Sequence, residues 1–145
     1  MTQEFIKIFN RDLDKLISQL QWFENEEELW ILKKDISNSP GNLYLHIAGN
    51  LQHFIGSVLG NTEYIRDREY EFSAKNIPKK ELIQQLEETK LVVTQTLKLL
   101  GDNRLKEDYP INVFKEVSSV GFFLIHLSTH LNYHLGQINY FRRLL

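Results

Sequence analysis

Apolar residues recur every three or four positions along four long segments of this 145-residue chain. The segments run from about Thr2 to Trp22, Asn42 to Leu59, Pro78 to Leu100 and Ser119 to Arg143. This spacing gives an α-helix one apolar face, which has to be buried against other helices. The sequence therefore predicts an all-α fold, a four-helix bundle with one or two long connections.

One connection between the long segments contains two arginines that are candidate functional residues. The residues from Tyr64 to Phe72 alternate charged with aromatic side chains and lack helical periodicity, so we expect an ordered loop there. Arg66 and Arg68 lie in this loop. They either pair with neighbouring acidic residues at the surface, or point at a carboxylate on a small substrate.

Composition limits the classes of function. The length fits a single domain over residues 1–145. The net charge is −2 and the basic residues are scattered, which argues against a nucleic-acid partner. There is no cysteine, so disulfides, thiolate ligands and a cysteine nucleophile are excluded. With no signal peptide and no apolar run of membrane-spanning length, we expect a cytoplasmic protein without a membrane partner.

Histidines are spaced as metal ligands on the last helix. His126, His130 and His134 stand four residues apart, and imidazoles at i and i+4 can converge on one divalent cation. The second helix carries His46 and His53, which share a face but are separated by a rise of about 10.5 Å. It can supply one further ligand, and the spacing does not say which. The alternative is that these histidines are hydrogen-bonded residues at the edge of the core.

The same segments resemble a known family. Three stretches carry the resemblance: Leu45–Leu51, Tyr64–Arg68 with Glu71-Phe72, and His130-x3-His134-x-Gly136-Gln137 followed by Tyr140 and Arg142-Arg143. They resemble the DinB-like (YfiT-like) metalloenzyme superfamily. The resemblance covers nearly the whole chain, although the first and third helices match only in periodicity.

The resemblance implies an up-down-down-up four-helix bundle that holds a divalent metal through His46, His130 and His134. His53 and His126 are then left outside the ligand set, as outer hydrogen-bonding residues or ordinary core-edge residues. Imidazole ligands suit Zn, Ni or Fe alike.

Two amides are placed to orient the ligand rings. Asn50 lies one turn from His46, and Gln137 lies just past His134. The free ring nitrogen of a metal-bound histidine usually has such a hydrogen-bonding partner. Either amide could instead make a plain hydrogen bond between helices.

The resemblance also implies an activity, the transfer of a low-molecular-weight thiol to an electrophilic substrate. Three neutral imidazoles leave a cation room for one more ligand, and such an ion acidifies a thiol or water. The alternatives are a metal-dependent hydrolase and a non-catalytic, stress-related metal-binding bundle. A transferase needs a pocket beside the metal with a cation such as Arg66 or Arg68 near its mouth, whereas a non-catalytic bundle would fill the site with side chains.

Two further features concern packing. Gly49 and Gly56 are seven residues apart on one helix face, which favours close helix packing. A homodimer is expected to form through the first helix or through the C-terminal Tyr140-Phe141-Leu144-Leu145, unless these residues simply complete the core.

Overall fold

The computed structural model describes residues 1–145 and confirms the all-α prediction. Its β-structure is limited to one isolated bridge between Asp108 and Ser119. None of its helices combines the length and apolarity needed to cross a membrane. The elements in order are α1 (Thr2–Trp22), the 3-10 helix η1 (Glu26–Trp30), α2 (Pro40–Leu51), the π-helical turn η2 (Gln52–Ser57), α3 (Val58–Gly60), α4 (Arg68–Ser73), α5 (Lys79–Leu100), the 3-10 helix η3 (Asp102–Lys106) and α6 (Val120–Leu144).

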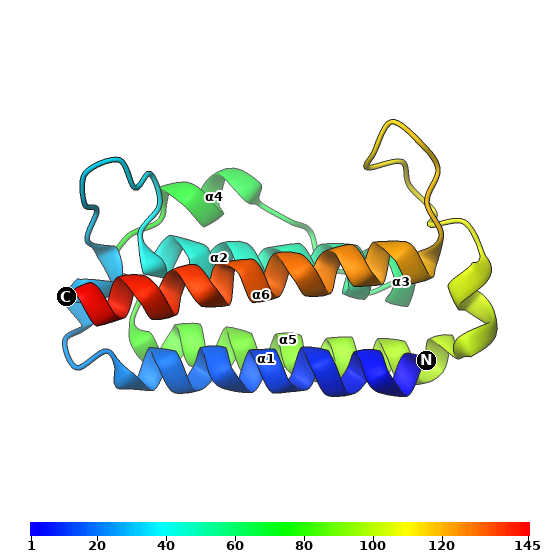
Figure 1. Cartoon of the computed structure of the whole chain (residues 1–145), viewed down its shortest axis with the longest axis horizontal. Helices are drawn as coiled ribbons and strands as arrows, with labels where there is room; N and C mark the ends of the chain where they lie inside the picture. Colours follow the sequence, from blue (N-terminus) through cyan, green and yellow to red (C-terminus); the bar gives the residue numbers. More distant parts are fainter.

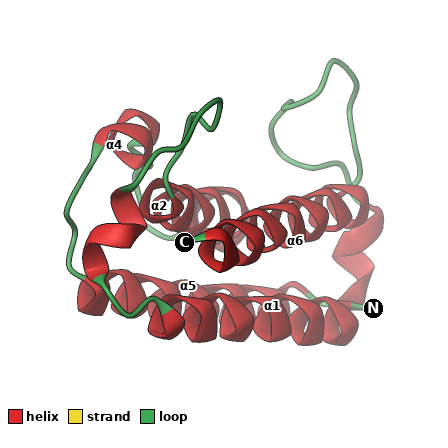
Figure 2. Ribbon diagram, turned by 60° about the vertical axis from the view of Figure 1, so that its left-hand side comes forward, coloured by secondary structure: helices red, strands yellow, loops and turns green.

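Four long helical segments lie side by side in two layers (Figures 1 and 2). One layer contains α1 and α5. The other contains α6 and the continuous segment formed by α2, η2 and α3. The chain runs in one direction along α1 and α6, and in the opposite direction along α2 and α5 (Figure 1). The apolar faces predicted from the sequence meet between the layers in one continuous core.

Side-chain caps fix where the two site-bearing helices begin. Ser39 precedes α2, and its Oγ accepts a hydrogen bond from the Asn42 backbone N–H at 3.3 Å. Pro40 then occupies the first helical position, which suits a residue without a backbone N–H. The helix thus starts two residues before the predicted Asn42. Ser119 caps α6 in the same way, accepting from the Phe122 N–H at 3.0 Å.

The expected loop between the second and third long segments contains a short helix, so that prediction was wrong for its second half. A six-residue helix is too short to display helical periodicity. Asp67 begins α4 by accepting a hydrogen bond from the Tyr70 N–H at 3.0 Å. At its other end, Asn42 Nδ2 donates to the carbonyls of Glu71 and Ala74 at 3.0 and 2.8 Å. These contacts dock α4 on the outside of α2 (Figure 2).

The two predicted packing glycines serve different neighbours. A Cβ at Gly56 would lie 2.8 Å from a methyl of Val92, so this glycine permits close packing against α5. A Cβ at Gly49 would lie only 2.0 Å from a carboxylate oxygen of Glu71. Gly49 therefore makes room for a side chain of α4 and not for a long helix.

The segment between η1 and α2 is held beside the C-terminal half of α6. Leu29 is fully buried, and the Trp30 ring lies against Gly41, where a Cβ would approach it to 2.7 Å. The following residues, 35 to 38, then face α6 across a groove.

Candidate metal centre

Three histidine side chains meet between α2 and α6. The Nε2 atom of His130 lies 3.2 Å from Nε2 of His46 and 3.1 Å from Nε2 of His134. One nitrogen from each of the three rings lies within 4.8 Å of the others. The four-residue spacing on α6 brings His130 and His134 together, and the packing of α2 on α6 adds His46. This group could hold a metal ion.

Two of the three nitrogen–nitrogen separations suit a shared cation, and all three atoms lie within 4.8 Å of one another. With metal–nitrogen bonds of about 2.0–2.1 Å, two ligand nitrogens lie about 2.9 Å apart at a right angle and about 3.3 Å apart at the tetrahedral angle. Both observed Nε2–Nε2 distances fall between these values. Three protein ligands of this type are typical of catalytic zinc sites, whereas structural sites usually have four.

Glu71 sets the tautomer of His46. Its Oε1 lies 3.0 Å from His46 Nδ1, and the glutamate side chain is buried. Burial raises the pKa of Glu71, but hydrogen bonds from His46 and Arg66 and the charge of Arg66 outweigh it and lower the pKa. An ionised carboxylate can only accept, so Nδ1 of His46 carries the proton. The lone pair of Nε2 is thereby left free to face the other two rings.

Arg66 supplies the counter-charge of Glu71. Its Nε donates to Oε2 at 2.9 Å and its Nη2 to Oε1 at 3.0 Å, a bidentate pair. Of the two alternatives for Arg66, pairing with an acidic residue is the one seen, although the partner is buried and not at the surface. Arg68 lies with its guanidinium 5.2 Å from the centre of the Phe72 ring.

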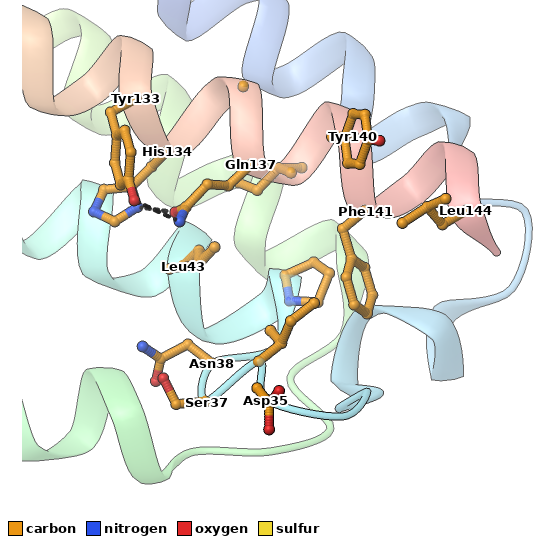
Figure 3. Close-up of a pocket in the computed structure, with 14 residues that line it drawn as sticks. Asp35, Ser37, Asn38, Leu43, Tyr133, His134, Gln137, Tyr140, Phe141 and Leu144 are labelled. Atoms are coloured by element: carbon orange, nitrogen blue, oxygen red, sulfur yellow. Dashed lines mark hydrogen bonds between the residues drawn. The ribbon is translucent and has the colours of Figure 1, made fainter.

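Gln137 holds His134 from the same helix. Its Oε1 lies 2.7 Å from His134 Nδ1, and its Nε2 donates to the Tyr133 hydroxyl at 3.1 Å (Figure 3). With the amide donating to Tyr133, its oxygen accepts the Nδ1 proton of His134. The Nε2 lone pair of His134 is therefore also directed at His130. Gln137 thus makes its side-chain hydrogen bonds within α6, to His134 and Tyr133, and not between helices.

The surroundings of His130 and His134 keep these two rings unprotonated. Burial, reinforced by the nearby His134 and His46, lowers the pKa of His130 to about 3. Burial also lowers the pKa of His134, although its hydrogen bond with Gln137 opposes the shift. A histidine must be neutral to bind a metal, so at neutral pH few protons compete with a cation for His130 and His134.

The remaining candidate residues lie outside this group. His126 packs against Phe114 and Phe123, with ring centroids 4.9 and 5.7 Å away. The His53 ring lies 4.7 Å from that of Phe54. Asn50, expected to orient His46, does not do so, because Glu71 takes that position and Asn50 Oδ1 is buried without a hydrogen-bond partner.

A groove of about 860 Å³ opens beside the histidines. His134 is one of its lining residues, and Tyr133 and Gln137 lie next to it (Figure 3). The far side is formed by the segment that precedes α2 and by Leu43. One of the three histidines, His134, therefore borders a cavity, whereas the other two are not among its lining residues. Neither Arg66 nor Arg68 lines this groove.

Glu71 is the site residue that sequence reasoning did not identify. Its helix has no apolar periodicity, and its partner His46 is 25 residues away in the chain. Two local signals were present. Asp67 is a good helix N-cap followed by acidic residues suited to a first turn. Gly49, one turn past His46, also left a gap on the helix face that some side chain had to fill.

The fold and the site together define an all-α protein with a candidate three-histidine metal centre. Residues 1–145 match the model of a family described as "Protein of unknown function (DUF1572)", and the chain belongs to that family. A comparison with curated proteins gave no match.

Replacing Glu71 with Gln should weaken metal binding about 10- to 100-fold, because the ring of His46 loses its anionic acceptor. Glu69→Gln, on the exposed side of the same short helix, serves as the control and should bind as the wild type does. Competition titrations of Zn²⁺ or Ni²⁺ against a chelating dye measure both. Equal affinities in the two variants would remove Glu71 from the site.

Gly49→Ala should lower the free energy of unfolding by about 1–3 kcal/mol, since the new methyl displaces a carboxylate that His46 and Arg66 hold in place. Gly136→Ala is the matched control. A Cβ there meets no atom within 4 Å, and alanine gains up to about 1 kcal/mol of helix propensity. Urea unfolding of both variants measures the difference, and a neutral Gly49→Ala would contradict the close approach of Glu71.

The metal-free protein should lose stability as the pH falls. The pKa of His130 is about 3 in the folded chain and about 6.5 when unfolded, so between these values the unfolded state binds more protons. As far as His130 is concerned, the free energy of unfolding has its full value above pH 6.5. It falls as the pH is lowered below 6.5. Denaturant titrations between pH 7 and pH 5 should show a shallower decline in His130→Gln than in the wild type. Parallel declines would exclude His130 as the titrating group.

Proposed function

We propose that this protein is a divalent-metal-dependent enzyme that transfers a low-molecular-weight thiol to an electrophilic substrate. The observation that carries the proposal is the convergence of three Nε2 atoms, two of them oriented by partners on their Nδ1 atoms. We further propose that the four long helical segments form a DinB/YfiT-like up-down-down-up bundle. The directions of the helices in Figure 1 are consistent with that topology.

His46, His130 and His134 would hold the metal, with Zn, Ni and Fe all compatible with imidazole ligands. When bound, such a cation lowers the pKa of a thiol or of water, which makes either one a nucleophile at neutral pH. Glu71 and Gln137 fix the two ring orientations, and Arg66 keeps Glu71 ionised in its buried position. The chain has no cysteine, so the sulfur has to come from a small-molecule thiol.

The groove beside His134 supports transfer of a group between two molecules. Its volume of about 860 Å³ lies in the range of small-molecule sites, and it reaches one of the candidate ligands. A hydrolase using the same cation to activate water is the second candidate, since water needs no separate binding site. The cationic residue expected at the mouth of a thiol site is not among the lining residues, so a charged thiol has to reach the metal from outside this groove.

A homodimer in the cytoplasm is part of the proposal. The apolar residues of α1 are mostly buried in the core, and so is Phe141. Tyr140, Leu144 and Leu145 remain exposed, but Tyr140 and Leu144 line the same groove. Leu145, and Trp22 at the end of α1, are therefore the residues available to a second copy while the groove stays open. Tryptophan is enriched in protein interfaces relative to the rest of the surface.

Elemental analysis of untagged protein, purified without chelator, tests the metal site. We expect about one equivalent of Zn, Ni or Fe per chain. His46→Ala and His130→Ala should lose most of it, whereas His53→Ala on the same helix as His46 should keep it. Metal retained equally in all three variants would contradict the site.

Assays of the metal-loaded protein then separate the two reactions. A transferase consumes 1-chloro-2,4-dinitrobenzene only when a thiol such as glutathione or bacillithiol is present, and His130→Ala should lower the rate at least about 100-fold. Turnover of a 4-nitrophenyl ester without any thiol would favour the hydrolase. A metal-loaded protein inactive in both assays, with a range of thiols and electrophiles, would support the non-catalytic alternative.

A further inference from the structure

The groove beside His134 is long, and it borders the candidate metal centre at that one residue. Its α6 side extends from Tyr133 to Leu144, about 16 Å at 1.5 Å per residue. In Figure 3, the side chains of Gln137, Tyr140 and Phe141 follow one another along this helix. A ligand lying in the groove would be extended, with one end at His134.

The lining is apolar and carries almost no charge. Leu43, Ile138, Phe141 and Leu144 supply aliphatic and aromatic surface. Asp35 is the only carboxylate among the lining residues, and no lysine or arginine lines the groove. An anionic ligand would exchange its hydration for a surface that offers no counter-charge, which is costly. An uncharged ligand meets no such penalty.

Two arginines of the neighbouring elements are engaged elsewhere. Arg142 donates from Nε to Gln19 at 2.6 Å, and its guanidinium lies 5.3 Å from the centre of the Trp22 ring. Arg66 is committed to Glu71. No arginine or lysine is among the lining residues, so no cationic side chain lies against a carboxylate or phosphate placed in the groove.

The end of the groove at His134 offers one directed polar group. The Tyr133 hydroxyl accepts a hydrogen bond from Gln137 Nε2 at 3.1 Å, so its own hydrogen is free to be donated. Because Tyr133 and His134 both line the groove, the acceptor would lie close to the candidate metal. A neutral oxygen, such as that of a carbonyl, is the group this hydroxyl would recognise.

We propose that the groove binds an elongated, uncharged molecule with an apolar body and an acceptor oxygen at the end beside His134. In the reaction proposed above, this molecule is the electrophilic substrate, and that assignment rests on the proposed function. The binding itself does not need turnover and is measured separately.

The probe is N-phenyl-1-naphthylamine, a neutral dye that fluoresces in apolar sites, displaced in turn by 2-undecanone and by undecanoate. The two ligands have similar chains and differ in the charge of the head group. We expect the ketone to displace the dye at a concentration at least about tenfold lower than the carboxylate does. Equal displacement, or stronger displacement by undecanoate, would overturn the proposal.

Three substitutions test whether the dye binds in this groove and whether the acceptor oxygen of the ketone lies beside Tyr133. Gly136→Trp fills the groove from a position where a Cβ meets no atom within 4 Å, and should abolish dye binding while metal content stays unchanged. Leu99→Trp, at an exposed site on α5, adds the same ring elsewhere and should have no effect. Tyr133→Phe should weaken the ketone about three- to tenfold and leave the dye unaffected. Dye binding that survives Gly136→Trp would contradict the site.

Light scattering and elemental analysis of the same samples complete the test. A stable dimer that binds no dye would show that a second copy covers the groove, which overturns the ligand proposal. Ketone binding by a protein that takes up no metal would support the ligand class and remove the enzymatic role. If the protein is a metal-loaded, thiol-dependent enzyme but its groove does not bind the ketone, the proposed enzymatic role would stand. The proposed ligand class would then be wrong.

Discussion

The buried ion pair between Arg66 and Glu71 is the interaction on which the candidate metal centre depends. A carboxylate in the interior is unfavourable unless its charge is paired and its oxygens are hydrogen-bonded. Arg66 meets both needs with two bonds, and His46 donates a third. Glu71 in turn decides which nitrogen of His46 carries the proton. The close approach requires a residue without a side chain at Gly49.

Two of the three candidate ligands are positioned by local helix geometry, and the third is positioned by tertiary packing. His130 and His134 are brought together by helix geometry alone, and Gln137 completes this local arrangement from three residues away. His46 joins them only because α2 packs against α6 and α4 docks on α2. Asn42 secures that docking by donating to two carbonyls at the end of α4. The position of one ligand thus depends on the tertiary structure, while the other two depend on local sequence.

This difference explains how much could be predicted from the sequence. Helical periodicity was sufficient for the all-α fold, because long amphipathic helices bury their apolar faces in a regular way. Spacing identified the row on α6 but could not choose between His46 and His53, which lie on nearly the same face of one helix. Glu71 was not predicted as a site residue, because its helix is too short to show periodicity. The contact between Glu71 and His46 also joins residues that are distant in the chain. Asn50 was a reasonable acceptor by spacing, but Glu71 reaches Nδ1 of His46 instead.

The histidine cluster lies beside a continuous apolar core of 29 buried residues, none of which is a histidine. The packing of the helices therefore comes from side chains other than the three imidazoles. In a zinc finger, by contrast, metal binding supplies most of the folding free energy. Here a bound cation would add stability according to its concentration and affinity, without determining the fold. Because imidazoles accept several divalent metals, a folded scaffold of this kind can exchange one metal for another, and the supply of metal in the cell then decides which ion it holds.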